Sequence, residues 1–360
     1  MSPELAFGLT PRMAAVLIGA GIGLAFGILA ERTRFCLRRA VAGPVRERRA
    51  AGGVWAMALA VALAGTTALL TAGLVDLSNH RFLAARLPVV AILVGGVLFG
   101  IGMVLARGCA SRLTVLAGTG NLRALTVILV FAAVAHATLK GVLAPVRTAL
   151  GSLSIDIGHY STLAALPGGA PLWAGLAVAA LIVVALRSGA RPLDIAGGAL
   201  IGALIPLGWL ATGWLLYDDF DPIAAESIGM TSAGAETLFW WVASSAIQPT
   251  FGVGVLGGIV AGSALAALVS RDWKLVGFTE EVSTGRYLAG GVLMGFGGVL
   301  AGGCTVGAGL TGVSTLSIAA ILAIVAIIAG AVLARAALAG AFPARAQLID
   351  AASAGAIFIP

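Results

Sequence analysis

The sequence predicts an all-α polytopic membrane protein with about nine transmembrane helices. Of its 360 residues, 60% are apolar and only 10% are charged, a composition that excludes a soluble globular domain. Apolar runs of about 18 residues or more are typical of helices that cross a membrane, and such runs follow one another along the chain. We therefore expect one transmembrane transport domain over residues 1–360, surrounded by the lipid bilayer.

The apolar runs and the loops between them define the elements in order. The first run follows Glu4 and Arg12 and carries no small-residue cleavage site, so we expect it to be a retained helix and not a signal peptide. The predicted spans are 12–30, 52–75, 88–106, 122–142, 171–187, 195–217, 250–269, 286–302 and 316–339.

Charge predicts which side of the membrane each loop occupies. The net charge is +7, and seven of the 22 basic residues fall in the loop 31–49, ERTRFCLRRAVAGPVRERR. Arginines beside membrane helices mark the cytoplasmic side, so we expect this loop in the cytoplasm and a multi-pass protein of the bacterial inner membrane. The acidic segment Asp218–Pro222, with Glu226 and Glu236, then lies on the opposite side. Nucleic-acid binding, which such a charge would suggest for a soluble protein, is not expected.

Two distant segments of the chain are closely similar. VGGVLFGIGMVLARGC (Val94–Cys109) and AGGVLMGFGGVLAGGC (Ala289–Cys304) lie 195 residues apart and are identical at 11 of 16 positions. This similarity predicts two pseudo-symmetric repeats, approximately 12–150 and 192–340, as in many transporters. Most of the shared glycines are explained by close helix packing, which needs small residues at this spacing.

Each repeated segment ends in a cysteine and is followed by a short stretch rich in Gly, Ser and Thr. The stretches Cys109–Asn121 and Cys304–Thr315 are too short to cross a bilayer, and each predicts a re-entrant half-helix that stops near the midplane. The N-terminus of such a half-helix offers free N–H groups and a positive dipole end to an anion. The candidate anion-binding residues beside the cysteines are Gly108, Ala110, Ser111, Gly303 and Thr305.

The three cysteines, Cys36, Cys109 and Cys304, form no C-x-x-C motif, which argues against a thioredoxin-like redox site. The three histidines show no ligand-like spacing, so we expect neither a metal site nor a cofactor. A single free cysteine is usually a small buried hydrophobe. Two cysteines at equivalent positions of a repeat, beside breaks in the helix, instead favour a functional role.

The segments TRFCLRRA, ARGCASR and GGCTVGAG, spread over about nine spans, resemble the YeeE/YedE family of sulfur-transport membrane proteins. The resemblance implies a bacterial inner-membrane importer of thiosulfate, not an enzyme, shaped as an hourglass with short central half-helices. It implies that Cys36, Cys109 and Cys304 line the substrate path, and that a small cytosolic sulfur carrier of the TusA type is a partner. Arg107 and Arg112 flank Cys109, whereas glycines hold the corresponding places around Cys304; these arginines either contact the substrate or anchor the half-helix.

The chemistry of these residues suits a sulfur oxyanion. Thiosulfate carries one soft terminal sulfur, to which a neutral thiol donates a weak hydrogen bond, and three oxygens that accept from backbone N–H groups. Two hypotheses of other classes remain. One is a channel for another small solute or anion, whose filter would not need thiols. The other is an enzyme, either a membrane sulfurtransferase or a quinone-linked thiol oxidoreductase, which would need a nucleophilic thiolate, a resolving cysteine or a base nearby.

Overall fold

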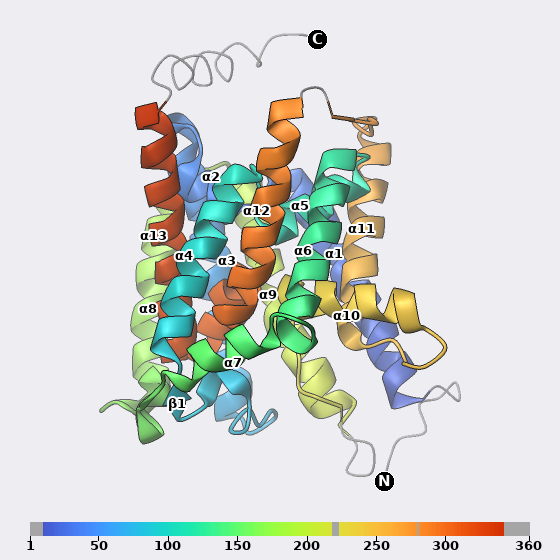
Figure 1. The fold of residues 1–360 in the computed structure, drawn as a ribbon. Coiled ribbons are helices and arrows are strands. Elements are labelled where there is room, and N and C mark those ends of the chain that lie inside the picture. Colours follow the sequence, from blue (N-terminus) through green and yellow to red (C-terminus); the bar gives the residue numbers. More distant parts are fainter. Residues whose placement is uncertain (1–9, 218–222, 279–280, 342–360) are drawn as a thin grey trace.

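The protein is a bundle of long helices that run side by side along one axis (Figure 1). The computed structural model describes residues 10–217, 223–278 and 281–341. Eight helical segments in this part of the chain are long and apolar enough to cross a membrane: Pro11–Ala42, Val45–Thr71, Val89–Gly118, Leu122–Lys140, Gly169–Leu186, Pro192–Leu215, Phe251–Val269 and Ile318–Ala339. They coincide with eight of the nine predicted spans, and the prediction of an all-α polytopic membrane protein is confirmed.

The ninth predicted span, 286–302, falls in the helix Glu281–Leu300. This helix is not among those eight, and it packs against the helices Val89–Leu105 and Leu122–Lys140. The helices are α1 (Pro11–Thr33), α2 (Leu37–Ala42), α3 (Val45–Thr71), α4 (Val89–Leu105), α5 (Ala110–Gly118), α6 (Leu122–Lys140), α7 (Ala144–Ser152), α8 (Gly169–Leu186), α9 (Pro192–Leu210), α10 (Met230–Ala243), α11 (Phe251–Val269), α12 (Glu281–Leu300) and α13 (Ile318–Ala341).

Shorter elements connect the helices. The segments η4 (Ala211–Leu215) and η5 (Gly307–Gly312) are π-helical, and η1 (Arg81–Leu83), η2 (Gly158–Ser161), η3 (Leu163–Ala165) and η6 (Val313–Thr315) are 3₁₀ turns. Two short strands, β1 (Arg86–Leu87) and β2 (Ile155–Asp156), pair antiparallel.

Local sequence explains where several helices begin. Thr10 caps α1 by accepting the Met13 N–H, and Asn121 caps α6 by accepting the Ala124 N–H. Pro192 opens α9, where its missing N–H costs nothing. Pro206 lies inside α9, and the last part of this span continues as the π-helical η4.

Glycines let the central helices approach closely. Helices α4 and α12 cross the bundle in opposite directions, with Gly95 against Gly297 and Gly102 against Gly290. A methyl group at Gly95 would lie 2.7 Å from the Gly297 carbonyl oxygen, and one at Gly290 would lie 2.8 Å from that of Gly102. These backbone contacts require small residues, as in many membrane helix pairs.

The other large contacts come in matching pairs. Helix α1 packs on α11 and α3 packs on α9, while α4 packs on α13 and α6 packs on α12. Exchanging the two halves of the chain converts each contact into its counterpart, because α1 then replaces α9, α3 replaces α11, α4 replaces α12 and α6 replaces α13.

The loops with the most arginines gather at one end of the bundle, which we call the basic end. Arg38, just after the start of α2, donates to the Arg107 carbonyl after α4, and the loop after α11 bonds to the turn between α5 and α6. The connections after α3 and after η4 lie at the opposite end. The predicted acidic segment Asp218–Pro222 lies outside the described residues.

Candidate functional site

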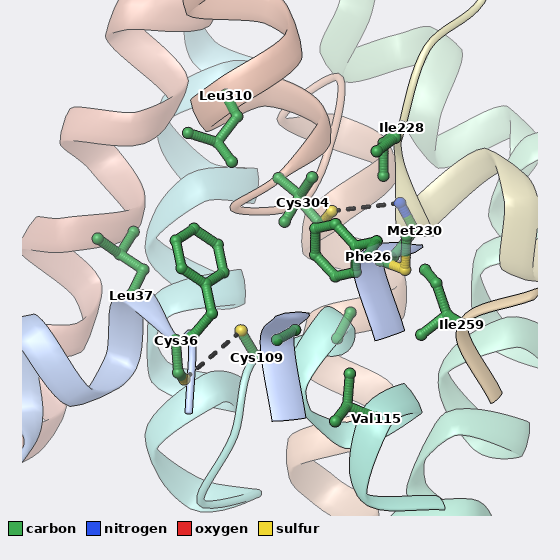
Figure 2. Close-up of a cluster of buried hydrophobic side chains, with 14 of the residues drawn as sticks. Phe26, Cys36, Leu37, Cys109, Val115, Ile228, Met230, Ile259, Cys304 and Leu310 are labelled. Carbon is green, nitrogen blue, oxygen red and sulfur yellow. Dashed lines mark hydrogen bonds between the residues drawn. The ribbon is translucent and has the colours of Figure 1, made fainter. Parts of the chain in front are cut away.

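Two of the three cysteines meet near the basic end. The sulfur atoms of Cys36 and Cys109 are 3.7 Å apart, although the residues are 73 positions apart in the sequence (Figure 2). Each residue has extended backbone and immediately precedes a short helix, α2 for Cys36 and α5 for Cys109. The Cys109 sulfur also lies 3.3 Å from the Ser111 hydroxyl, so this predicted neighbour does contact the thiol.

Cys304 lies apart from this pair, within the same cluster of buried apolar side chains (Figure 2). It follows α12 and is fully buried. Its sulfur accepts the N–H groups of Met230 at 3.4 Å and Gly307 at 3.3 Å. The two backbone donors, one from the start of α10 and one from the start of η5, fix the position of the sulfur.

A cavity of about 510 Å³ opens at the end of the bundle opposite the basic end, and we call it the vestibule. Its walls come from the connections after α3 and after η4, together with parts of η4, α10 and η5. The lining residues are Asp76, Ser78, Asn79, His80, Arg81, Phe82, Trp209, Gly213, Tyr217, Ile223, Ala224, Ala225, Glu226, Ser227, Ile228, Gly229, Ser232, Glu236, Gly307 and Thr311.

The vestibule wall nearest Cys304 consists of two glycines. A methyl group added to Gly307 would lie 3.4 Å from the Gly229 Cα and 3.7 Å from the Cys304 sulfur. Since both glycines line the vestibule, they separate it from the thiol by the thickness of a backbone. We call Gly229 and Gly307 the vestibule floor. In this conformation the floor is closed, because Cys304 has no exposed surface.

Arg81 supplies positive charge to the vestibule. Its side chain is open to the cavity and forms a cation–π contact with the Phe82 ring, 5.2 Å from the centroid. Among the described residues it has no ion-pair partner within salt-bridge distance. Surrounding protein lowers the pKa of the guanidinium, and the carboxylates of Glu226 and Glu236 oppose that shift.

Two further titratable groups in the vestibule have shifted pKa values. Burial, and to a smaller extent repulsion by Glu236, raise the pKa of Glu226 to about 7, while Arg81 opposes this shift. Burial lowers the pKa of His80 to about 4, with a smaller contribution from Arg81. His80 is therefore neutral at physiological pH, and its Nδ1 accepts the Phe82 N–H at 3.3 Å.

Several buried donors around the vestibule and Cys304 have no hydrogen-bond partner in the described part of the chain. They are Trp209 Nε1, whose ring lines the vestibule, and the hydroxyls of Thr231 and Thr305, which follow Met230 and Cys304 in the sequence. Buried polar groups are normally satisfied, so the unpartnered Trp209 nitrogen favours a polar ligand in the vestibule. The Thr231 hydroxyl lies toward Gly298 of α12, where an added methyl would meet it at 3.1 Å.

A sequence model described as "Sulphur transport" matches residues 32–333. The chain belongs to the sulphur-transport family. The match covers the three cysteine segments and the vestibule, and it confirms the family resemblance that the cysteine motifs indicated.

Two relatives in this sulphur-transport family are similar over most of their length. The thiosulfate transporter TsuA of Escherichia coli K12 is 30% identical over 329 residues, which cover 82% of this chain and 86% of the relative. The thiosulfate transporter TsuA of Spirochaeta thermophila is 27% identical over 329 residues, covering 87% and 96%. Both relatives are transporters, in agreement with the expectation that this family member is not an enzyme.

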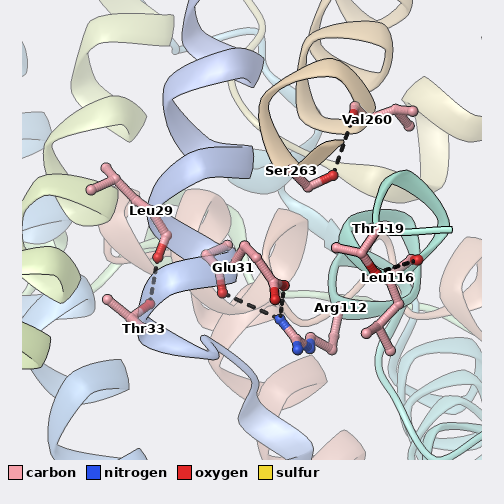
Figure 3. A network of polar contacts seen from close by, with 9 residues as sticks. Leu29, Glu31, Thr33, Arg112, Leu116, Thr119, Val260 and Ser263 are labelled. Carbon is pink, nitrogen blue, oxygen red and sulfur yellow. Dashed lines mark hydrogen bonds and ion pairs between the residues drawn. The ribbon is translucent and has the colours of Figure 1, made fainter. Parts of the chain in front are cut away.

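The two arginines beside Cys109 occupy different environments in this member of the family. Arg112 Nη1 binds the Glu31 carboxylate at 2.9 Å and the Ala30 carbonyl at 3.4 Å, so it joins α5 to α1 (Figure 3). Arg107 has a left-handed backbone with φ of 56°, and its guanidinium lies 5.9 Å from the centroid of the Tyr287 ring. The corresponding residue of the second half, Gly302, is also left-handed, with φ of 76°.

The remaining predicted residues are backbone neighbours of the cysteines. The Gly108 N–H bonds to the Met103 carbonyl and helps to end α4, and Ala110 is the first residue of α5. Gly303 packs against the start of η5, where an added methyl would lie 2.7 Å from the Ala308 nitrogen. Sequence reasoning did not find the vestibule residues Arg81 and Trp209, because they carry no motif; only their shared cavity marks them.

Proposed function

We propose that this protein imports thiosulfate, or a closely related sulfur anion, across the bacterial inner membrane. The substrate enters the vestibule, passes the floor to Cys304, continues to Cys109 and Cys36, and leaves at the basic end. We call these three cysteines the thiol path. The observation that carries the proposal is the order of these sites. A vestibule at one end holds an arginine that forms no ion pair among the described residues, a buried thiol lies directly behind its floor, and a thiol pair lies toward the other end.

The chemistry of each station suits the substrate. Arg81 attracts a dianion into the vestibule, and the unpartnered Trp209 nitrogen suits its oxygens. A neutral thiol at Cys304 donates a weak hydrogen bond to the terminal sulfur, and single weak contacts allow the anion to leave again. Sulfate lacks the soft sulfur and is expected to interact less well with the thiols.

We further propose that the single transmembrane domain contains two inverted repeats, approximately 12–150 and 192–340. The antiparallel packing of α4 and α12 through equivalent glycines supports this arrangement, as does the left-handed turn shared by Arg107 and Gly302. In this arrangement α5 and η5 are the two half-helices, and each follows one cysteine of the path. The arginine–glutamate pair then anchors the first half-helix, while the packed glycines hold the second.

The proposed orientation places the basic loop 31–49 in the cytoplasm. Arg32, Arg34, Arg46 and Arg49 are exposed in this loop, close to the Cys36 end of the path. This basic surface is where a small cytosolic sulfur carrier of the TusA type would dock. Moving a dianion inward against about 100 mV costs about 4.6 kcal/mol, at about 2.3 kcal/mol per charge. A carrier that removes the substrate on the cytoplasmic side would offset this cost.

Uptake of radiolabelled thiosulfate by cells that make the protein tests the proposal. Wild type is compared with Cys109→Ser and Cys304→Ser at matched membrane abundance, with Gly21→Ala as a control because a methyl there meets no other atom within 4 Å. We expect uptake in wild type and the control and its loss in both cysteine variants. Uptake that survives both cysteine substitutions would favour a channel for another small solute.

A second comparison separates transport from chemistry on the protein. A sulfurtransferase would retain labelled sulfur covalently, whereas a transporter releases it unchanged. We expect no label on the protein after denaturation without reductant, and stable labelling would contradict transport as the sole activity.

Arg81→Gln should raise the thiosulfate concentration needed for half-maximal uptake while leaving the amount of folded protein unchanged, because Arg81 forms no ion pair within the described residues.

A further inference from the structure

Cys36 and Cys109 form a close pair of free thiols whose proximity transport alone does not require. Their sulfur atoms are 3.7 Å apart, and both residues are free cysteines. A disulfide has a sulfur–sulfur distance of about 2.05 Å, so bond formation requires the two atoms to approach by about 1.7 Å. Rotation of the two side chains between staggered rotamers supplies movements of this size, and both residues lie in extended backbone before short helices.

The backbone around the pair is tied together on both sides. Arg38, two residues after Cys36, donates to the carbonyl of Arg107, two residues before Cys109, at 3.3 Å. Arg112, three residues after Cys109, is paired with Glu31 at the end of α1. These two links hold the connections that carry the cysteines next to each other, so the thiols stay within reach.

Access to the two sulfur atoms is unequal. The exposed fraction of the surface is 8% for Cys36 and 1% for Cys109. A reagent that approaches from the basic end therefore meets Cys36 first. Cys304 is fully buried, its sulfur is held by two backbone N–H groups, and no second thiol lies within hydrogen-bond distance in the described chain.

We propose that the Cys36–Cys109 pair is a redox modification site that takes low-molecular-weight disulfides of the glutathione class and closes the thiol path when oxidised. The Cys36 thiolate attacks one sulfur of the small disulfide, forms a mixed disulfide and releases one thiol. The Cys109 thiolate then attacks the Cys36 sulfur, forms the Cys36–Cys109 bond and releases the second thiol. Two protein thiols and one small disulfide thus give one protein disulfide and two small thiols, with two electrons passing to the small disulfide.

The oxidised pair blocks transport for two reasons. A disulfide has no S–H group to donate to the terminal sulfur of the anion, and the new bond joins the two connections across the path. Excess small thiol reverses the reaction by the same exchange steps. The effect on uptake rests on the proposed function, whereas formation of the disulfide does not depend on it.

Thiol counting on the purified full-length chain in lipid nanodiscs tests the chemistry. The protein is equilibrated with reduced and oxidised glutathione at graded ratios, alkylated under denaturing conditions, and weighed intact. We expect two of the three thiols to disappear together, and peptides containing Cys36 and Cys109 to appear cross-linked. Three free thiols at ratios that oxidise a reference dithiol protein would overturn the proposal, as would consumption of Cys304.

Single substitutions distinguish the steps. Cys304→Ser should still lose two thiols, because Cys304 takes no part. Cys109→Ser should stop at a glutathione adduct on Cys36, whereas Cys36→Ser should leave Cys109 free because Cys109 is the less accessible of the two. An adduct on Cys109 in the Cys36→Ser chain at the rate seen for Cys36 would contradict the assigned order of attack.

Uptake into vesicles that contain the wild-type protein tests whether the Cys36–Cys109 disulfide blocks transport. Oxidation of the Cys36–Cys109 pair to the disulfide should reduce thiosulfate uptake at least tenfold, and reduction should restore it. Unchanged uptake after the disulfide has formed would show that the disulfide does not block transport. If the reduced protein takes up no thiosulfate at all, the proposed function fails, while the thiol count still decides whether the pair is a redox site.

Discussion

Replacing Gly307 with alanine tests whether the vestibule floor is the entrance to the thiol path. The added methyl would lie 3.4 Å from the Gly229 Cα and 3.7 Å from the Cys304 sulfur, with no third atom within 4 Å. Both distances are ordinary van der Waals contacts, so the fold has room for the methyl. An anion that passes between the two glycines does not have that room.

The expected magnitudes differ for stability and for transport. Because the contacts are unstrained and alanine is the better helix former, the free energy of unfolding should change by no more than about 1 kcal/mol. A rise of only about 1.4 kcal/mol in the barrier reduces a rate tenfold. We therefore expect Gly307→Ala to reduce thiosulfate uptake at least tenfold at unchanged abundance, and Gly307→Val to abolish it.

A control substitution in the same π-helical segment distinguishes a blocked substrate path from a loss of folded protein. A methyl at Gly309 would lie 2.8 Å from Ile324 Cδ1 and 3.2 Å from the Trp55 ring, away from the floor. Gly309→Ala should therefore lower the melting temperature and reduce uptake only in proportion to the loss of folded protein. Initial rates of labelled thiosulfate uptake, divided by membrane abundance, give the comparison. Wild-type rates per molecule in Gly307→Ala would refute the assignment of the floor as the entrance.

Three further outcomes are expected. The raised pKa of Glu226, about 7, means that the vestibule is more positive below this pH. Uptake should therefore rise as the pH falls from 8 to 6, and Glu226→Gln should remove this dependence. Because the folded chain binds this proton more tightly than the unfolded chain, the contribution of Glu226 to stability is present in acid and is lost as the pH rises through about 7, which a melting curve at each pH would detect. Arg112→Gln or Glu31→Gln alone should destabilise the protein by about 1–3 kcal/mol and the double variant by less than the sum, measured as a double-mutant cycle; additive losses would mean that the ion pair contributes nothing. Gly100→Leu should prevent accumulation of folded protein because its side chain would collide with the backbone of α13, whereas Gly21→Leu on the open face of α1 should be tolerated, and equal yields would contradict the close packing.

The order and type of the elements follow from the sequence alone. Apolar runs of sufficient length can only be helices in a bilayer, since every backbone group must be satisfied within its own segment. This local rule predicted eight of the membrane-spanning helices. Glycines around the cysteines also indicated interruptions of the helices. Helix α4 ends at Leu105, just before Cys109, but the stretch after Cys109 is the regular helix α5, whereas the stretch after Cys304 is π-helical. The family follows from the same cysteine segments.

Which side chains meet was decided only by the tertiary structure. Cys36 and Cys109 are 73 residues apart, and the similar segments in the sequence associate Cys109 with Cys304 and not with Cys36. The partner of Arg112 is Glu31 on α1, and the site of Glu226 is a vestibule whose walls come from distant connections. These contacts depend on how helices rotate and approach one another, which is set by backbone contacts between glycines far apart in the chain. A local pattern specifies each helix and its apolar character, but the pairing of faces is a property of the whole bundle.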